Sequence, residues 1–403
     1  MNQGSHDAAV LLTLNIGSSS IKFGVFNAIN ESKRLLAGQF DDLDGRFVWT
    51  QFGNDGQPTK RRELEVESFA DETRCEVVLQ QIFKLLRSDE LELRTIVHRV
   101  VHGGGDYHGP TLIDENTIET LETFASWAPL HQPECLHAIQ LTIQSHPEVP
   151  QIACFDTAFH RTMPKEAAEY AIPRYLTERG IRRYGFHGLS FQSVLRQLRE
   201  LEPRLAKGRV VMAHLGGGSS LCGLQAGQSV GTTMGLTPLD GFPMATRCGS
   251  LDPGVVLHLM RGEHMTGEQI SQMLYQESGL RRVSQTSGDM RTLLASPAVE
   301  SKDAVRLYVH RVAREIGALF VDLQGLDGLV FTGGIGENSP EIRDMVCQRL
   351  KSLGIAIAPA ANAGSDRRIS DERSAIAVWR LHSDEESEMA RQAILYGRHR
   401  NSV

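Results

Sequence analysis

The sequence predicts an α/β fold made of two related domains, with mixed sheets flanked by helices. Short apolar segments of strand length alternate with longer segments whose apolar residues recur every three or four positions, a pattern typical of such folds. A strand–turn–strand pattern also occurs twice: matching Ser20 to Ser220 also matches Ile21 to Leu221, an offset of 200 residues in a chain of 403. We therefore expect an internal duplication in which each domain offers one hairpin tip to a shared cleft.

The individual elements follow from apolar patterning and from the small-residue turns between them. The two hairpins are expected to pair strands at 10–14 with 21–26 and at 210–215 with 221–224. Further strands are expected at 95–101, 151–155 and 328–332, and helices at 191–200, at 303–323, from 340 onward and at 385–396. The helix at 303–323 has the clearest amphipathic pattern, with one stripe made of Val305, Val309, Val312, Ile316, Leu319 and Phe320.

Composition and charge exclude several classes of protein. Hydrophobic residues make up 41% and charged residues 23%, as in ordinary globular domains, and a net charge of −7 argues against a nucleic-acid binder, which needs a basic surface. The six cysteines form no CxxC pair, which indicates reduced thiols. Because neither a signal peptide nor a run of about 18 apolar residues is apparent, we expect a cytoplasmic protein with no membrane partner.

Three small-residue turns, at 17–20, 216–220 and 333–338, each follow a predicted strand. Backbone N–H groups in such turns bind phosphate, because small residues let the anion approach closely. None of the three matches the P-loop or the dinucleotide-binding pattern, and each alone is also explained as a tight turn. Together they favour a nucleotide as ligand.

Two arginines stand in otherwise apolar segments and are candidate anion ligands. Arg99 lies in the strand at 95–101, and Arg247 lies near a Met-Ala-Thr sequence. A buried arginine is costly unless it meets an anion, which here is either a substrate or a carboxylate in a structural ion pair. Lys22, at the first hairpin, either extends to solvent or points at a phosphate.

The histidines and carboxylates leave more alternatives open. His98 and His102 share one face of a strand but lie roughly 13 Å apart, too far to share a metal at about 2.1 Å, so a zinc site is not expected. For His131 and His187, sequence alone does not separate a ligand from a core histidine. The candidate magnesium ligands or reactant-orienting acids are Asp156, Asp289 and Glu385, although an aspartate after a strand also commonly caps a helix.

With these segments assembled, the chain from Leu14 to about Ala390 resembles the acetate kinase family, within the actin/hexokinase/Hsp70-like fold group. The resemblance rests on the segments at 15–23, 98–104, 128–131, 155–160, 183–188, 214–216, 234–235, 237–239, 287–291 and 332–339. It implies two domains of the actin-like ATPase (ribonuclease H-like) fold with an ATP cleft between them. The first domain would span 1–156, with the C-terminal helix at 385–398 packing back on it, and the second, nucleotide-binding domain would span 157–384.

The resemblance also implies a role for each matching residue. Asn15 and Glu385 look like magnesium contacts, Arg99 like the ligand of the substrate carboxylate, and Asp156 like the active-site acid. His187 and Arg247 resemble the pair that stabilises the transferring phosphoryl group. The implied ATP-binding residues are Lys22, His214, Leu215, Gly216, Gly217, Gly218, Asp289, Met290, Arg291, Gly334, Ile335, Gly336, Glu337 and Asn338. The implied apolar pocket for the acyl tail consists of Val101, Leu130, Phe186 and Pro238.

The expected activity is therefore reversible transfer of the ATP γ-phosphoryl group to acetate, with Mg²⁺ as cofactor (Mn²⁺ as an alternative ion) and ATP or ADP as co-substrate. A carboxylate attacking a triphosphate brings like charges together, so the site must supply cations, and we expect direct in-line transfer with no phosphoenzyme. The alternatives are a propionate or mixed short-chain acyl kinase and a nucleotide-binding regulator without turnover. A sugar kinase is disfavoured, since an alcohol does not need two arginines. A homodimer is implied by the family.

Several positions depart from the family pattern. Gly217 stands where the family has asparagine, which removes a side-chain amide from the phosphate turn. The other departures are Leu189 and Phe191 for a threonine and a histidine, Cys248 and Ser250 for a serine and an aspartate, and Ser387 for a leucine. None of them replaces a residue to which the resemblance gives a catalytic role, but they put the rate and the preferred acid in doubt.

Overall fold

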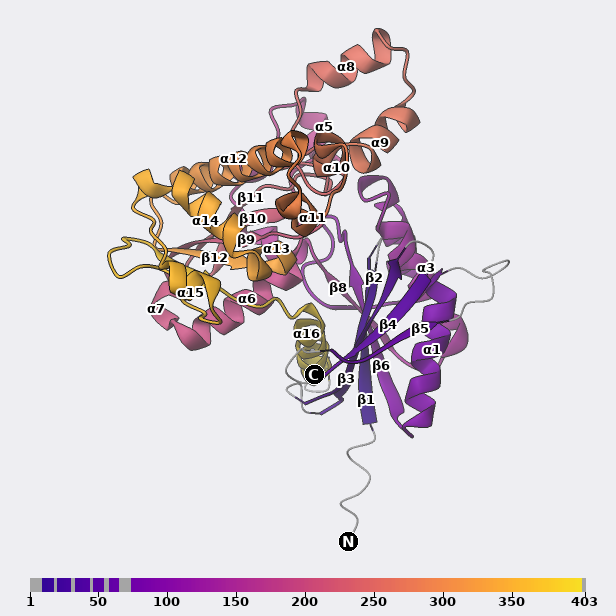
Figure 1. Cartoon of the computed structure of the whole chain (residues 1–403). Coiled ribbons are helices and arrows are strands. Elements are labelled where there is room, and N and C mark those ends of the chain that lie inside the picture. Colours follow the sequence, from indigo (N-terminus) through magenta and orange to yellow (C-terminus); the bar gives the residue numbers. More distant parts are fainter. Residues whose placement is uncertain are drawn as a thin grey trace. The chain divides into compact units, whose positions relative to one another are not determined.

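The computed structural model describes residues 9–17, 20–29, 33–43, 46–53, 58–64 and 74–400 (Figure 1). The chain forms two compact units, one made of Met1–Phe159 and Asp384–Val403 and the other of His160–Ser383. It therefore passes from one unit to the other twice, after Phe159 and after Ser383. In the described part of the chain, no helix is both long enough and apolar enough to cross a membrane.

The first unit is organised around an eight-stranded sheet with the order β5-β4-β3-β2-β1-β6-β8-β7. The strands are β1 (Ala9–Ile16), β2 (Ser20–Asn27), β3 (Arg34–Leu43), β4 (Arg46–Phe52), β5 (Pro58–Leu64), β6 (Glu92–Val100), β7 (Thr111–Leu112) and β8 (Gln151–Phe155). The helices are α1 (Arg74–Ser88), α2 (Glu115–Glu122), α3 (Gln132–Ser145) and α16 (Glu385–Arg400), with a 3₁₀ turn at Ala125–Trp127.

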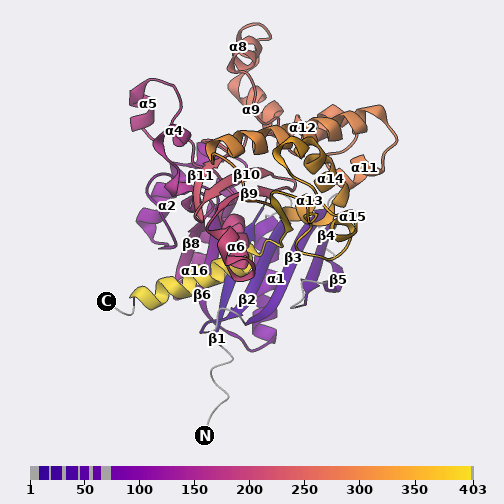
Figure 2. The ribbon, with the colours of Figure 1, turned by 90° about the vertical axis from the view of Figure 1, so that its left-hand side faces the viewer.

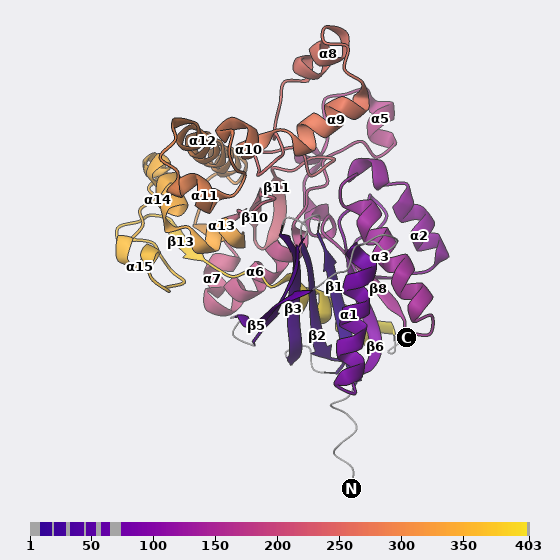
Figure 3. The same ribbon diagram turned by 45° about the vertical axis from the view of Figure 1, so that its right-hand side comes forward.

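Helices cover both faces of the central strands in this unit. Alternate residues of β1 form a core with the apolar side of α1 and with Ala138 of α3. The C-terminal helix α16 packs against β1, β2, β6 and β8 from the opposite side, as Figure 3 shows. Strand β1 is consequently buried along nearly its whole length, which explains its almost continuous apolar sequence.

The second unit contains a five-stranded sheet with the order β11-β10-β9-β12-β13. Its strands are β9 (Arg209–His214), β10 (Ser220–Gln225), β11 (Gln228–Thr232), β12 (Gly328–Thr332) and β13 (Ala377–Arg380). Its helices are α4 (Lys165–Ala168), α5 (Arg174–Glu178), α6 (Gly188–Leu201), α7 (Pro203–Ala206), α8 (Pro253–Arg261), α9 (Gly267–Gln276), α10 (Gly279–Ser284), α11 (Met290–Ala295), α12 (Val299–Asp322), α13 (Gly333–Asn338), α14 (Pro340–Arg349) and α15 (Pro359–Ala363). Short 3₁₀ turns lie at Ala158–Thr162 and Lys351–Leu353.

The long helix α12 forms the core of the second unit. The predicted stripe is confirmed, because Val305, Val309, Val312 and Ile316 are all buried and pack with Leu319 against the sheet. Small residues in the sheet allow the close approach: a Cβ built on Gly223 would lie 3.2 Å from Leu319 Cδ2. Figure 2 shows α6 near β9, and α8 standing away from this sheet.

The two sheets share one plan. In the first unit β2 and β3 are antiparallel additions to β1, while β6 and β8 continue in parallel on its other side. In the second unit β10, β11, β9, β12 and β13 have the same order and the same directions. The prediction of two related domains with mixed sheets is therefore confirmed.

One predicted element is wrong and others shift at their ends. The segment 333–338, expected as a turn, is the helix α13, because the chain turns directly into a helix at Gly333, whose φ is +76°. The helix expected from 191 begins at Gly188 because His187 makes the turn into it, and the helix expected from 303 begins at Val299. Residues 18 and 19 of the first predicted phosphate turn lie outside the described residues.

Candidate functional site

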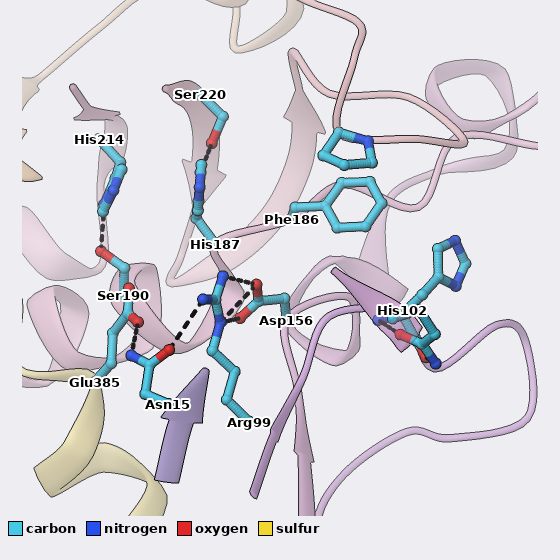
Figure 4. A network of polar contacts seen from close by, with 12 residues as sticks. Asn15, Arg99, His102, Asp156, Phe186, His187, Ser190, His214, Ser220 and Glu385 are labelled. Atoms are coloured by element: carbon cyan, nitrogen blue, oxygen red, sulfur yellow. Dashed lines mark hydrogen bonds and ion pairs between the residues drawn. The ribbon is translucent and has the colours of Figure 1, made fainter. Parts of the chain in front are cut away.

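In the first unit, polar side chains gather where three neighbouring strands end. Asn15 lies near the end of β1, Arg99 near the end of β6, and Asp156 directly after β8. Parallel strands bring their carboxyl ends to the same edge of a sheet, so residues far apart in sequence meet there. Glu385, in the first turn of α16, joins the same network (Figure 4).

Arg99 and Asp156 form a buried ion pair. Arg99 Nη2 donates to Asp156 Oδ2 at 2.6 Å and Nε donates to the same carboxylate at 3.1 Å, while the Asp156 side chain is 0% exposed. Burial disfavours the arginine charge, but the carboxylates of Asp156 and Glu385 outweigh this effect and raise the pKa of Arg99. Of the two explanations left open for this arginine, the structure provides the ion pair, with the Arg99 side chain still 15% exposed.

Asn15 links the arginine to two glutamates. Its Oδ1 accepts from Arg99 Nη1 at 3.0 Å, and its Nδ2 donates to Glu385 Oε2 at 2.9 Å and to Glu386 Oε1 at 3.0 Å. The amide oxygen therefore faces a cation, and the amide nitrogen orients the two carboxylates. The oxygens that would meet a cation are those of the Glu385 and Glu386 carboxylates, and such ligands suit magnesium.

In the second unit, His187 is held in an unusual backbone conformation. It precedes α6 with φ 59° and ψ 24°, a left-handed conformation that costs a non-glycine residue of order 1–3 kcal/mol unless its surroundings impose it. Its Nδ1 is 2.9 Å from Ser220 Oγ, and its ring stacks on His214 with centroids 4.3 Å apart. Figure 4 shows both contacts, together with the bond between His214 and Ser190.

The side chains of His187 and Arg247 both lie close to Gly218. A Cβ built on Gly218 would lie 3.4 Å from His187 Nε2 and 3.7 Å from Arg247 Nη1. Arg247 is oriented by the Pro238 carbonyl, which accepts from Nη1 at 3.0 Å. A protonated or N–H-bearing ring and a guanidinium thus face one glycine turn, an arrangement suited to a phosphoryl group.

A cavity of about 390 Å³ lies beside this turn within the second unit. Its lining includes eight of the residues assigned to ATP by resemblance: Gly216, Gly217, Asp289, Met290, Arg291, Gly334, Ile335 and Asn338. The size is within the range of small-molecule pockets. Leu294 and Ser339 also line it and were missed: Leu294 lies outside the matched segments, and Ser339, the last residue of the segment at 332–339, was given no role.

Asp289 is shaped by its own helix. Its carboxylate caps α11 by accepting from the backbone N–H of Arg291 at 2.9 Å and of Thr292 at 3.0 Å. The hydrogen bond from the Arg291 side chain is the main reason that the pKa of Asp289 lies below its usual value. Asp289 therefore fixes the start of α11 at the cavity wall.

The other predicted site residues divide between the units. Val101 is buried and Leu130 is half-buried in the first unit, where Lys22 is exposed on β2. Phe186 and Pro238 are buried in the second unit.

His98, at which no zinc site was expected, is a core histidine. It is fully buried with Nε2 2.8 Å from Gln151 Oε1, and burial lowers its pKa to about 4. It is therefore neutral at physiological pH, and the hydrogen bond satisfies its ring.

Two of the departures from the family pattern have clear packing partners. Phe191 is fully buried and turns its edge toward His160 and His214, with ring centroids 5.7 Å and 6.4 Å away. Ser250 Oγ donates to Asp240 Oδ1 at 2.8 Å, and the same carboxylate pairs with Arg183. An apolar ring and a neutral hydroxyl thus occupy the two positions at which the resemblance leads one to expect a histidine and an acid.

Comparison with known proteins places this geometry in context. Residues 10–391 match the model of the acetokinase family. An acetate kinase of Rhodopseudomonas palustris is 44% identical over 390 residues, which cover 95% of this chain and 97% of that protein. An acetate kinase of Rickettsia akari is 37% identical over 389 residues, which cover 96% of this chain and 99% of that protein.

Solved structures give the same similarity. A propionate kinase from Francisella tularensis is 34% identical with a TM-score of 0.86, and the match covers 95% of this chain and 98% of that one. The acetate kinase of Porphyromonas gingivalis is 30% identical with a TM-score of 0.81, and the match covers 96% and 100% of the two chains.

Proposed function

The chain belongs to the acetokinase family, and from that premise we propose that it transfers the γ-phosphoryl group of ATP reversibly to acetate, giving ADP and acetyl phosphate. The observation that carries the proposal is a family match along the whole chain in which the four residues implied in catalysis, Arg99, Asp156, His187 and Arg247, are all present. A non-catalytic regulator would have no need to retain all four.

The first unit supplies the acceptor side in this proposal. Asp156 accepts from one edge of the Arg99 guanidinium, and Asn15 accepts from one further N–H of that group. The other N–H groups of Arg99 would then bind the acetate carboxylate. Asp156 holds the guanidinium plane and balances its charge. The planar guanidinium of Arg99 would orient the acetate carboxylate as well as attract it, which supports an in-line approach to the phosphate.

The second unit supplies the phosphoryl side. His187 and Arg247 converge on the turn at Gly218 and would neutralise the charge that develops on the transferring group. Phosphoryl transfer requires positioning and electrostatic stabilisation more than covalent chemistry, so we propose direct transfer without a phosphoenzyme. The cavity beside Gly216 and Asp289 would hold the nucleotide.

The acidic end of α16 fits the magnesium ion that this reaction would use. Magnesium takes one or two carboxylates and completes its coordination with phosphate and water. Glu385, with Glu386 beside it, supplies such carboxylates, and Asn15 orients both. Bound there, the ion would neutralise phosphate charge. Manganese would fit the same oxygen donors.

A propionate kinase is the second candidate, and one observation favours it. A propionate kinase is among the solved structures most like this chain, with a TM-score of 0.86. The residues that the resemblance assigns to the acyl tail, Val101, Leu130, Phe186 and Pro238, are all apolar. One methylene in an apolar environment is worth only about 1–3 kcal/mol, so both acids are expected to be substrates to some degree.

We also propose a cytoplasmic homodimer. Support for self-association comes from α8, where Leu257 and Met260 are each 49% exposed and Val255 is 39% exposed. Such an apolar helix is costly to leave in water. Light scattering of the protein and of a Leu257→Glu variant would test this, with loss of the dimer in the variant as the expected result.

The activity is tested by trapping the product. The protein is incubated with MgATP, hydroxylamine and acids of two to five carbons, and the acyl hydroxamate is measured. Hydroxamate formed fastest from acetate is the expected result, and equal rates for acetate and propionate would favour the broader specificity. No product from any acid would contradict the proposed function.

A further inference from the structure

We propose that Glu337 is a positioning residue and not a nucleotide ligand: through Ser383 and Ser190 it sets the protonation pattern of the His214 ring. The role of these residues in the reaction rests on the proposed function, but their hydrogen bonds are present without any ligand. Sequence resemblance had placed Glu337 among the ATP-binding residues.

Protein donors already occupy both oxygens of the Glu337 carboxylate. Oε1 accepts from the backbone N–H of Gly333 at 2.9 Å and of Ser383 at 3.1 Å, and Oε2 lies 2.7 Å from His382 Nδ1. The side chain is only 16% exposed. Burial alone would raise the pKa of this carboxyl, but the hydrogen bonds from His382 and the two backbone groups lower it, so the carboxylate is ionised. Its charge is thus engaged before any nucleotide binds.

These bonds attach α13 to the segment at 382–383. Gly333 is the first residue of α13, and the backbone N–H groups of Ile335 and Gly336 donate to the Leu215 carbonyl at 2.7 Å and 3.1 Å. The helix is therefore held against the residue that precedes the Gly216 turn. The Glu337 carboxylate accepts from the first N–H of the same helix, at Gly333, and also from the N–H of Ser383.

From Ser383 a line of hydroxyl groups leads to His214. Ser383 Oγ donates to Ser190 Oγ at 2.8 Å, and Ser190 Oγ lies 2.7 Å from His214 Nδ1. Ser190 accepts from Ser383 and keeps its own hydroxyl proton, which in the proposed arrangement it donates to Nδ1. That nitrogen then accepts, and the proton of the neutral ring lies on Nε2.

The Nε2 atom is the one that faces the phosphate turn. A Cβ built on Gly216 would lie 3.9 Å from His214 Nε2, and Gly216 lines the cavity. The relay from Glu337 thus presents an N–H donor toward the proposed position of the phosphates. Without Glu337, Ser383 loses the acceptor for its backbone N–H, and its hydroxyl group is no longer held in position beside Ser190.

The test compares Glu337→Ala with Glu337→Gln. The glutamine amide keeps an oxygen that accepts from Gly333 and Ser383, and its NH₂ donates to a neutral His382, so we expect near-normal kinetics. The alanine variant is expected to raise KM for ATP and to lower kcat/KM by roughly 10²-fold, because a displaced positioning group costs about that much. Glu341→Gln and Glu341→Ala, at an exposed glutamate of the next helix, are the matched controls.

A second readout follows the ring of His214 in the whole chain without any substrate. Imidazole ¹⁵N spectra, assigned with His214→Asn, are expected to show an unprotonated Nδ1 and a protonated Nε2 in the unmodified protein and in Glu337→Gln. Glu337→Ala, Ser383→Ala and Ser190→Ala are each expected to give mixed tautomers.

Two results would overturn the proposal. In the first, Glu337→Gln is impaired as strongly as Glu337→Ala, as expected for a carboxylate that binds the nucleotide or its metal. In the second, the His214 spectrum is unchanged in Ser383→Ala, a variant that tests the relay even where Glu337→Ala fails to fold. Failure of the proposed function would appear instead as absence of phosphoryl transfer by the unmodified chain, while the spectra would still decide the relay.

Discussion

The two units build different sites on the same sheet. In the first unit the ends of the three central parallel strands carry Asn15, Arg99 and Asp156, which are bonded to one another. In the second unit the corresponding strands end at His214, at Thr332, where β12 leads directly into the glycines of α13, and at Arg380. The same edge thus presents a buried ion pair in one unit and chiefly imidazole rings, hydroxyls and backbone groups in the other.

This difference shows how one sheet topology can support two different kinds of binding site. A buried charge must be balanced, so the residues of the first unit stabilise one another as well as any substrate. Glycine turns and neutral hydrogen bonds need no such balance. Substitutions in the first site are therefore expected to change both stability and activity, and those in the second site chiefly activity.

The largest effect is expected for Arg99→Ala. It leaves the fully buried Asp156 carboxylate without its cation, which should lower the free energy of unfolding by about 3–5 kcal/mol and abolish measurable turnover. Urea denaturation and the hydroxamate assay measure the two effects. The double variant Arg99→Met with Asp156→Asn should regain part of the stability and none of the activity. A single variant as stable as the unmodified protein would break the comparison.

Arg247→Ala is expected to reduce turnover with little loss of stability. The Arg247 guanidinium donates to a neutral acceptor, the Pro238 carbonyl. Losing this contact therefore leaves no buried charge without its counter-charge. Loss of one preorganised cation at the transferring group should lower kcat by roughly 10²–10³-fold, or about 2.7–4 kcal/mol. Near-normal turnover in this variant would remove Arg247 from the site, and Arg291→Ala on the cavity wall provides a comparison.

Acid should weaken the first unit through Asp384. Burial raises the pKa of this carboxyl, but Arg34 and Ser387 lower it below the usual value. A carboxyl whose pKa is lower in the folded state stabilises the protein at pH values above its unfolded-state pKa of about 3.9. This stabilisation is lost as the pH falls through the folded-state pKa. Asp384→Asn should therefore cost about 1 kcal/mol at pH 7, and the difference should vanish toward pH 3. Urea denaturation across pH measures it, with the exposed Asp366→Asn as control; a constant difference would contradict the pKa argument.

The smallest effect is expected for Gly217→Asn, which restores the family's residue in the phosphate turn. Apart from its own chain neighbours, no atom of the described residues lies within 4 Å of a Cβ built on Gly217, so the change should be tolerated with about 0.5 kcal/mol or less in stability. A new amide donor facing the cavity should lower KM for ATP about two- to tenfold. Gly218→Ala, whose Cβ meets His187 and Arg247, should instead reduce kcat. An unchanged KM in Gly217→Asn would show that the amide is not used.

Sequence patterning was sufficient for most elements and insufficient at their ends. The amphipathic stripe of α12 and the strands β8 and β12 were predicted because apolar periodicity is a local property. The helix α13 was missed because its sequence, Gly-Gly-Ile-Gly-Glu-Asn, has low helix propensity. Its bonds to the Leu215 carbonyl and the bond from the Gly333 N–H to the Glu337 carboxylate stabilise it, and the bonds to Leu215 depend on β9 lying beside β12.

The sequence by itself determined the two-domain α/β plan, the duplicated hairpin and the types of residue available for chemistry. The tertiary structure alone decided which of them meet. Arg99 and Asp156 are 57 positions apart and Ser383 and Ser190 are 193 apart, yet each pair is hydrogen-bonded. Such contacts depend on which strands become neighbours, and crossover helices set that order through packing of the whole core. For this reason the sequence left Arg99 equally open to a substrate and to an ion pair, and it could not show that the Glu337 carboxylate accepts from Gly333 and Ser383.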